Sequence, residues 1–487
     1  MTGSRTRTSV TLGAALFFVL TAGPSTAAER ARRGPSWDLG HGELMVSRDR
    51  RFLLHADGTP FLYLGDTAWE LFHRLKREEA ARYLENRRQK GFTVVQAVAL
   101  AELDGLRVPN AYGHRPLVEN DPARPDVTPG PANDYWDHVD FVIATAAEKG
   151  ISIGFLPTWG DKVGPATSGK GPAVFDEASA RAYGRFLGER YRSASNILWI
   201  LGGDRPPLTP EGDYRSIWRA MAAGIKEGDE GRHLITYHPG GETSSSGFLH
   251  DETWLAFNMI QSGHGAKDAP NHDRIAADFN LSPPKPVLDG EPRYEDHPVN
   301  WDPKNGWFDD VDVRQAAYWA LFAGAFGHTY GCHDIWQMYA PGRAPVSSAR
   351  TPWRDALDLP GAWDMLHVRR LLLSRPFLRR VPDPAFVTGG QGLGADHVQA
   401  ARDPSGSYAF VYVPTGKPVT VDLRRIAGPT ARAWWFDPRT GAASAIGDFR
   451  TGKHREFTPP GQPARGNDWV LVVDAAGQGF PPPGRVE

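Results

Sequence analysis

Eight short apolar stretches recur between residues 61 and 336, and helical patterns separate most of them. The stretches are rich in Val, Ile, Leu and aromatic residues, as buried strands are. They cover residues 61–66, 93–100, 151–157, 196–204, 234–239, 254–263, 284–294 and 328–336. The helical patterns cover residues 76–91, 135–150, 176–191, 213–228, 313–327 and 362–374. Strands that alternate with helices favour parallel βαβ units, so this alternation predicts an α/β fold built on a parallel sheet.

The number of units favours a (β/α)8 TIM barrel over an open doubly wound sheet. Eight units fit a barrel, which runs from ~200 to over 400 residues. A doubly wound sheet usually carries a glycine-rich first turn, and the first turn here, LGDTAWE at 64–70, does not match that pattern. We therefore expect a (β/α)8 barrel over residues 42–382.

The pattern changes after residue 382. Short apolar stretches such as SYAFVYVP and DWVLVVDAA lie between Gly, Pro and Asp turns, and no helical pattern occurs. Such a pattern is typical of a small β-sandwich. We predict a separate all-β sandwich domain over residues 383–487.

The first 28 residues have the layout of a secretory signal peptide. Arg5 and Arg7 precede the apolar run SVTLGAALFFVLTAG, and small residues follow it up to Ala28. The run has about 15 residues, fewer than the ~20 that span a bilayer, which favours a signal peptide over a membrane anchor. We expect residues 29–41 to be a linker and the protein to be secreted or periplasmic, without membrane attachment after cleavage.

Charge and motifs argue against several classes of function. The formal net charge of -2 gives no reason to expect a nucleic-acid partner. The single cysteine, Cys332, excludes a disulfide framework within the chain and a cysteine zinc site. Neither the G-x-S-x-G motif of serine hydrolases nor the H-E-x-x-H motif of zinc proteases occurs. We expect no metal site and no cofactor.

Polar and aromatic residues follow the predicted strands. In a parallel barrel the carboxyl ends of all strands meet at one mouth, where active sites lie. The residues at these ends are Asp66, Trp69, Glu102, Asp104, Trp159, Asp161, Asp204, Arg205, Tyr237, His238, Gln261, His264, Asp289, Glu291, His333, Asp334 and Trp336. The apolar face of a tryptophan ring suits the apolar face of a sugar ring. We predict sugar contacts for Asp66, Trp69, Trp159, His238 and Trp336.

Two of the strand-end acids stand out as a catalytic pair. Asp204 follows Gly202 and Gly203, which allow a tight turn and the close approach of a ligand. Glu291 follows the apolar segment PVLDG. Glycoside hydrolysis needs two carboxyl groups, one protonated and one ionised, on either side of the bond. We predict that Asp204 and Glu291 are these groups; the alternative for each is a helix cap or a salt-bridge partner.

Three segments together resemble a known family. FLYLGDTAWELFHRL, ILWILGGDRPP and VLDGEPRYED resemble the apiosidase-like catalytic domain of glycoside hydrolase family 140, and ARAWWFDPRTG resembles a β-domain named for collagen binding that often follows it. The resemblance implies a (β/α)8 barrel, with Asp204 as acid/base and Glu291 as nucleophile. It also implies release of apiose-linked units from the pectic polysaccharide rhamnogalacturonan II. Related retaining barrels commonly have Glu where Asp204 stands, so the shorter side chain requires an adjusted geometry.

These observations lead to one main hypothesis and two alternatives. We expect a secreted glycoside hydrolase whose substrate is an oligo- or polysaccharide of the plant cell wall. The residues alone allow either retention or inversion at the anomeric carbon, and the resemblance favours retention. The alternatives are a non-catalytic carbohydrate-binding barrel, and a peptidase or collagen adhesin that acts through the C-terminal domain.

Overall fold

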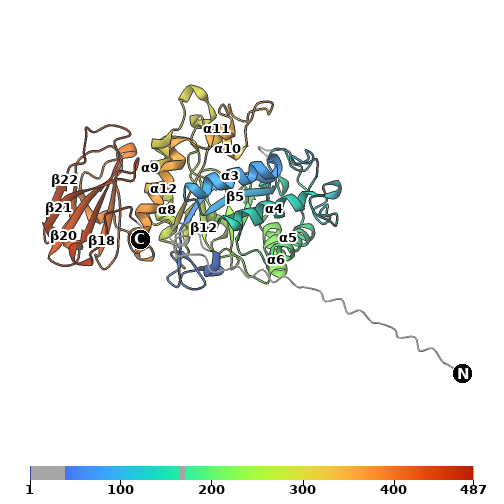
Figure 1. Cartoon of the computed structure of the whole chain (residues 1–487), viewed down its shortest axis with the longest axis horizontal. Helices are drawn as coiled ribbons and strands as arrows, with labels where there is room; N and C mark the ends of the chain where they lie inside the picture. The colour runs from blue at the N-terminus through green and yellow to red at the C-terminus, as the bar shows by residue number, and fades with distance from the viewer. Residues whose placement is uncertain (2–38, 165–169, 486–487) are drawn as a thin grey trace.

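The computed structural model describes Met1 and residues 39–164 and 170–485 (Figure 1). The predicted signal peptide, residues 1–28, and most of the predicted linker therefore lie outside the described residues. The last three linker residues, Leu39–His41, form a short 3-10 helix. Among the residues that the structure describes, no helix combines the length and the apolar composition that a membrane span requires.

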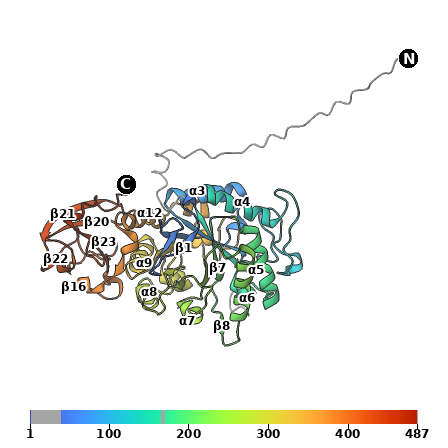
Figure 2. The same cartoon turned by 90° about the horizontal axis from the view of Figure 1, so that it is seen from below.

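Eight parallel strands form the centre of the larger domain, as the sequence predicts (Figure 2). Their order in the sheet is β10, β7, β6, β5, β4, β14, β13 and β12. A parallel bridge between Ile235 and Leu255 joins β10 to the segment that leads into β12, and the Ala256 N–H donates to the Ile235 carbonyl at 2.8 Å. The sheet thus closes into a barrel. The strands are β4 (Tyr63–Thr67), β5 (Val94–Leu100), β6 (Ser152–Thr158), β7 (Ile197–Gly202), β10 (Ile235–His238), β12 (Asn258–Gln261), β13 (Val287–Asp289) and β14 (Gly327–Tyr330).

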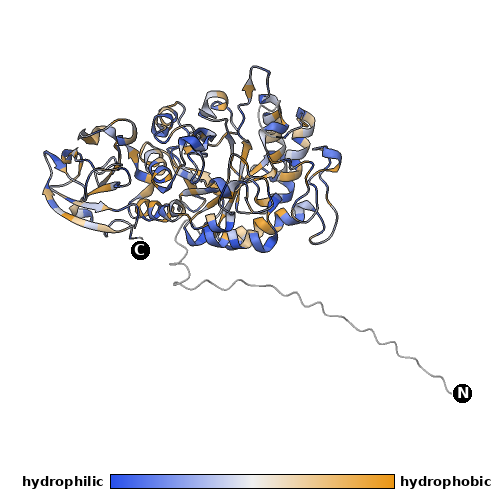
Figure 3. Cartoon of the chain, turned by 90° about the horizontal axis from the view of Figure 1, so that it is seen from above, coloured by the Kyte–Doolittle hydropathy of each residue, from blue (hydrophilic) through white to orange (hydrophobic). Residues whose placement is uncertain are grey.

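Helices cover the outside of the barrel, so the strands are buried on both faces. Every residue of β5, β6 and β7 is buried, which explains their unbroken apolar runs. Figure 3 shows helices that carry both hydrophobic and hydrophilic residues around these strands. The long helices are α3 (Arg77–Gln89), α4 (Tyr135–Glu148), α5 (Glu177–Tyr191), α6 (Arg215–Asp229), α8 (Asn271–Phe279), α9 (Asp310–Phe322) and α12 (Pro360–Leu373).

The helix α8 follows β12 and has no counterpart in the predicted pattern. Its buried face consists of Asn271, His272, Ile275 and Asp278, so three of its four buried residues are polar. Such a face lacks the apolar period that announces a helix in a sequence. After β10 the chain forms only one helical turn, α7 (Ser246–Leu249), which is too short to show any period.

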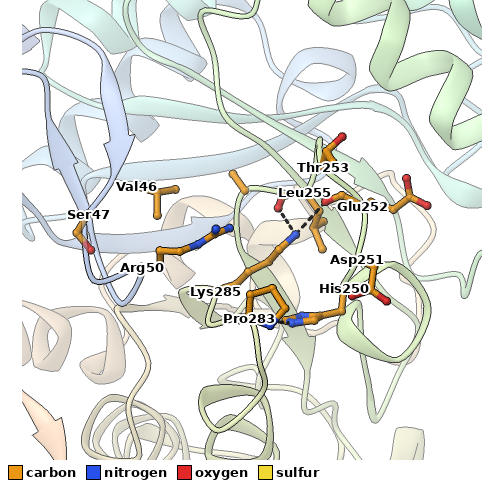
Figure 4. Close-up of a pocket in the computed structure, with 11 residues that line it drawn as sticks. Val46, Ser47, Arg50, His250, Asp251, Glu252, Thr253, Leu255, Pro283 and Lys285 are labelled. Carbon is orange, nitrogen blue, oxygen red and sulfur yellow. Dashed lines mark hydrogen bonds between the residues drawn. The ribbon is translucent and has the colours of Figure 1, made fainter.

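A small antiparallel sheet lies at the end of the barrel opposite the mouth. It consists of β1 (Leu44–Val46), β2 (Leu53–His55) and β3 (Pro60–Phe61). A pocket of about 490 Å³ lies between this sheet and the segments that lead into β12 and β13. Figure 4 shows the residues that line it. Lys285 lines it and donates to the carbonyls of Glu252 and Leu255 at 2.9 and 2.6 Å. Because these residues precede their strands, this pocket is separate from the mouth.

The C-terminal domain is an antiparallel sandwich, as predicted. One sheet has six strands: β15 (Val381–Pro382), β17 (Gln399–Arg402), β18 (Tyr408–Val413), β23 (Trp469–Ala475), β20 (Thr430–Phe436) and β21 (Ala443–Arg450). The other has three: β16 (Val387–Gly389), β19 (Val419–Asp422) and β22 (His454–Phe457). The first strand, β15, pairs with β17, so the sandwich sheet begins just before the boundary expected at residue 383.

The central strands β18 and β23 of the six-stranded sheet are buried on both faces because the outer face of the sheet packs on the barrel domain there. Along β18, Ala409 and Val411 belong to the sandwich core, whereas Phe410 and Tyr412 belong to the core of the barrel domain. This is the period of two that a strand imposes. Tyr412 stacks on Tyr318 of α9 with ring centroids 4.8 Å apart. The two domains therefore share a continuous apolar contact.

Buried ion pairs join the same surfaces. The Arg314 guanidinium of α9 donates to both carboxylate oxygens of Asp468 at 2.8 Å and to Asp364 of α12 at 2.6 Å. Arg375 donates to both oxygens of Asp474 at 2.8 Å. Arg314 is 1% exposed, so its charge depends on these partners.

We expect that Arg314→Ala destabilises the protein through the domain interface. Removing the partner of a buried charge typically costs about 3–5 kcal/mol, whereas an exposed pair contributes about 1 kcal/mol or less. Urea unfolding of Arg314→Ala should show this loss, and Arg185→Ala, which breaks an exposed pair with Glu189, should not. Equal midpoints for the two variants would contradict the interpretation.

Candidate active site

His238, at the end of β10, links the two predicted catalytic acids. The backbone N–H of Asp204 donates to His238 Nδ1 at 3.2 Å, and His238 Nε2 lies 3.0 Å from Glu291 Oε2. Because Nδ1 accepts a hydrogen bond, a neutral imidazole carries its proton on Nε2, which faces Glu291. The His238 side chain is fully buried, so this geometry holds the loops after β7 and β13 together.

Two histidines hold the Glu291 carboxylate. His264 Nε2, on the loop after β12, lies 3.1 Å from Glu291 Oε1, opposite the contact with His238. Burial alone would raise the pKa of Glu291, but the hydrogen bonds and charges of His238 and His264 outweigh it and lower the pKa to about 2. Glu291 is therefore an ionised carboxylate at any ordinary pH.

Asp204 sits on a backbone turn that only the two preceding glycines allow. A Cβ on Gly202 would collide with the His238 carbonyl, and one on Gly203 would lie 3.0 Å from backbone atoms of Trp159 and Gly160. Both glycines have positive φ, 90° and 106°, and Asp204 itself is left-handed at 54°. The sequence Gly-Gly-Asp thus places an acidic side chain where an ordinary strand exit could not.

The environment of Asp204 favours its protonated form. Burial and the negative charge of Glu291 raise its pKa, and they outweigh the opposing effect of Arg205, whose Nη1 donates to Asp204 Oδ2 at 2.6 Å. The side chain keeps 28% exposure, so a ligand can reach it. Two carboxyl groups at one mouth, one with a raised pKa and one with a lowered pKa, match the acid and the carboxylate that glycoside hydrolysis needs.

Aromatic rings form one wall of the mouth. Trp69 lies 5.2 Å from Trp159 and 5.4 Å from His238, centroid to centroid. Trp159 Nε1 is buried and has no hydrogen-bond partner among the described residues, so it can donate to a sugar hydroxyl. Trp336 lies further round and donates from Nε1 to His333 Nδ1 at 3.2 Å. The structure thus brings Trp69, Trp159 and His238 together.

Asp66 does not lie at the mouth, contrary to the prediction. Its carboxylate accepts hydrogen bonds from Tyr83 and, at 2.6 Å, from Arg87 Nε, both on α3, and it is fully buried. Side chains alternate along β4, so Gly65 faces the barrel interior while Asp66 faces the surrounding helices. Asp66 is therefore a structural salt-bridge partner of Arg87.

Two further residues belong to the site although the predicted set omitted them. His264 holds Glu291, as described above. Glu102, after β5, has its pKa raised to about 8 by burial and then by the charge of Asp204. Both occupy strand ends, the signal that identified the others, but residue type alone did not distinguish them from loop residues. Within residues 39–164 and 170–485, no group of three His, Cys, Asp or Glu side chains could hold a metal ion.

We expect Asp66→Asn to lower stability without changing substrate affinity. The substitution leaves the buried charge of Arg87 poorly compensated, which typically costs about 3–5 kcal/mol. The check is urea unfolding together with KM on any cleaved glycan. A raised KM with an unchanged unfolding midpoint would restore Asp66 to the binding site.

Comparison with family models supports the architecture. A family described as "Apiosidase-like, catalytic domain" matches residues 47–379. A family described as "Putative collagen-binding domain of a collagenase" matches residues 381–474. A search of curated proteins found no match.

Solved structures of glycoside hydrolases are similar to this chain over most of its length. A structure described as "Glycoside hydrolase" is 36% identical, with a TM-score of 0.83, covering 91% of this chain and 99% of that one. A glycoside hydrolase family 5 structure from Bacteroides vulgatus is 35% identical, with a TM-score of 0.84, covering 92% of this chain and 95% of the other. A structure described as "a putative glycoside hydrolase" from the same species is 18% identical, with a TM-score of 0.66. The match covers 90% of this chain and 83% of that one, and it shows the fold alone.

Proposed function

The chain belongs to the apiosidase-like family and is a glycoside hydrolase, and we propose that it cleaves a pectin-type glycan of the plant cell wall with retention of configuration. The observation that carries the mechanism is the pair of opposite pKa shifts at Asp204 and Glu291. The apiose-containing linkage is the substrate that the family 140 resemblance suggests. The leader at residues 1–28 supports export of the enzyme to the periplasm or the medium.

In the first step Glu291 attacks the anomeric carbon and Asp204 protonates the departing oxygen. The two histidines hold the Glu291 carboxylate by both oxygens, so its orientation is set before substrate binds. The ionised form that they stabilise is the nucleophilic one. The proton of Asp204 passes to the leaving group, and a covalent glycosyl ester forms on Glu291.

In the second step Asp204 changes from a general acid to a general base, because Glu291 has lost its negative charge. Once Glu291 is an ester, it no longer carries the negative charge that raises the pKa of Asp204. The pKa of Asp204 then falls, so its side chain is ionised. This carboxylate accepts a proton from the water that attacks the ester. The electrostatic coupling of the pair therefore supplies the switch from acid to base that retention requires.

The geometry favours this enzyme over the two alternatives. A non-catalytic barrel that only binds glycans does not need two acids whose pKa values are shifted in opposite directions. The mouth holds such a pair. For the C-terminal domain, we assign a role in stabilising the barrel, because aromatic side chains of β18 stack on those of α9. Pull-down on collagen with the full chain tests the adhesin alternative.

We expect Glu291→Gln and Asp204→Ala to impair catalysis differently. Loss of the nucleophile should abolish turnover of every substrate. Loss of the acid should lower kcat by about 10²–10⁴-fold on pectic oligosaccharides, and by less on aryl glycosides whose leaving group needs no proton. Asp213→Asn, which changes an exposed acid in the same connection between β7 and α6, is the matched control.

Steady-state kinetics on rhamnogalacturonan II oligosaccharides and on aryl glycosides measures these effects, and proton NMR of the first-formed product gives the stereochemistry. A folded Glu291→Gln variant with near wild-type activity would exclude the assignment, and an inverted product would exclude retention.

The pH profile should follow the two shifted acids. Glu291, with its pKa lowered to about 2, stays ionised throughout the usual acidic range, so kcat/KM should not fall between about pH 5 and pH 3. Asp204 must be protonated, and its pKa lies above the ordinary 3.8, so kcat/KM should fall only as the pH rises through that higher value. With an activated aryl glycoside, Asp204→Ala should lose this alkaline limb. A wild-type acid limb near pH 4.5 would contradict the lowered pKa of Glu291.

A further inference from the structure

Trp301 is one of two exposed tryptophans among residues 39–164 and 170–485, with 54% of its surface accessible; the other is Trp363, with 41%. It lies on the loop between β13 and α9, at the end of the 3-10 turn Val299–Trp301. This loop leaves the same strand that presents Glu291. A single exposed aromatic residue is common in proteins, so its surroundings decide whether it has a function.

The indole is held beside the residue that positions the nucleophile. Its ring centroid lies 5.8 Å from those of His264 and His297, in edge-to-face contacts with interplanar angles of 76° and 84°. His264 in turn lies 3.1 Å from Glu291 Oε1. The Asn300 N–H donates to the His264 carbonyl at 2.8 Å, which fixes the loop to the same histidine. Trp301 is therefore one side chain away from the catalytic carboxylate, at the rim of the mouth.

The backbone at this position is also unusual. Asn300 and Trp301 have positive φ values of 52° and 58°, in the left-handed region. A bulky side chain rarely adopts this conformation, and such strain collects at ligand sites, where the surrounding structure enforces it. Here the Val299 N–H bonds to the Gly306 carbonyl at 2.9 Å and the Trp301 N–H to the Pro298 carbonyl at 3.1 Å. These hydrogen bonds hold the exposed Trp301 ring beside the candidate active site.

We propose that Trp301 is a stacking platform for a sugar ring of the substrate adjoining the one that Glu291 attacks. A flat, exposed indole of fixed orientation matches the apolar face of a sugar ring and loses little conformational entropy on binding. This assignment rests on the proposed glycosidase function and names a specificity determinant of the same mouth. It predicts preference for glycans that extend beyond the cleaved linkage over compact aryl glycosides.

The test compares Trp301→Ala, Trp301→Phe and Trp363→Ala. Trp363 is the matched control because it is an exposed tryptophan on α12 whose ring lies 4.3 Å from Lys90 Nζ, on a helix outside the barrel. We expect Trp301→Ala to raise KM for rhamnogalacturonan II oligosaccharides about tenfold, with kcat and the unfolding midpoint unchanged. Trp301→Phe should retain most of the affinity, and aryl glycosides should be unaffected by any of the three.

An unchanged oligosaccharide KM in Trp301→Ala would overturn the proposal, as would an equal loss of kcat on aryl glycosides, which would mean that Trp301 acts by positioning His264. Calorimetric binding of the same oligosaccharides to Glu291→Gln, with and without Trp301→Ala, separates this result from the proposed function. Weaker binding in the double variant supports the platform even if the wild type cleaves none of the glycans. Equal binding rejects it even if hydrolysis is confirmed.

Discussion

The active site depends on one buried imidazole. His238 accepts a hydrogen bond from the Asp204 backbone on one side and contacts Glu291 on the other, so the loops after β7 and β13 keep a defined relation through β10. With His264 it lowers the pKa of Glu291, while burial and the negative charge of Glu291 raise the pKa of Asp204. The proposed acid and the proposed nucleophile therefore influence each other's pKa.

The second domain supports the barrel that carries this unit. Apolar side chains of β18 and the buried pairs of Arg314 and Arg375 join the C-terminal domain to α9 and to the segment that follows α12. Helix α9 follows the loop that carries Glu291 and Trp301, so the interface also steadies that loop. Because breaking such buried pairs leaves uncompensated charge, we expect the two domains to unfold together.

Local patterns in the sequence predicted most of the architecture. Apolar strands such as 196–204 and turn residues such as Gly202 and Gly203 carry their structural meaning in residue type and order. Helix α8 was not predicted because its buried face is mostly polar. The polar side chains of this face bond to residues distant in sequence, as Asn271 does to Asp289 at 3.0 Å. The spacing of apolar residues cannot predict a helix whose buried face is held by polar contacts.

The sequence by itself determined the barrel, the sandwich and the positions of strand-end acids, because periodicity and glycine turns act over a few residues. Only the tertiary structure decided what each acid does. Asp66 and Asp204 both end a buried strand, yet Asp66 faces Arg87 on a helix and Asp204 faces the mouth beside His238. Elements far away in the chain decide which way a side chain points at the end of a strand. They also supply the charges that surround it.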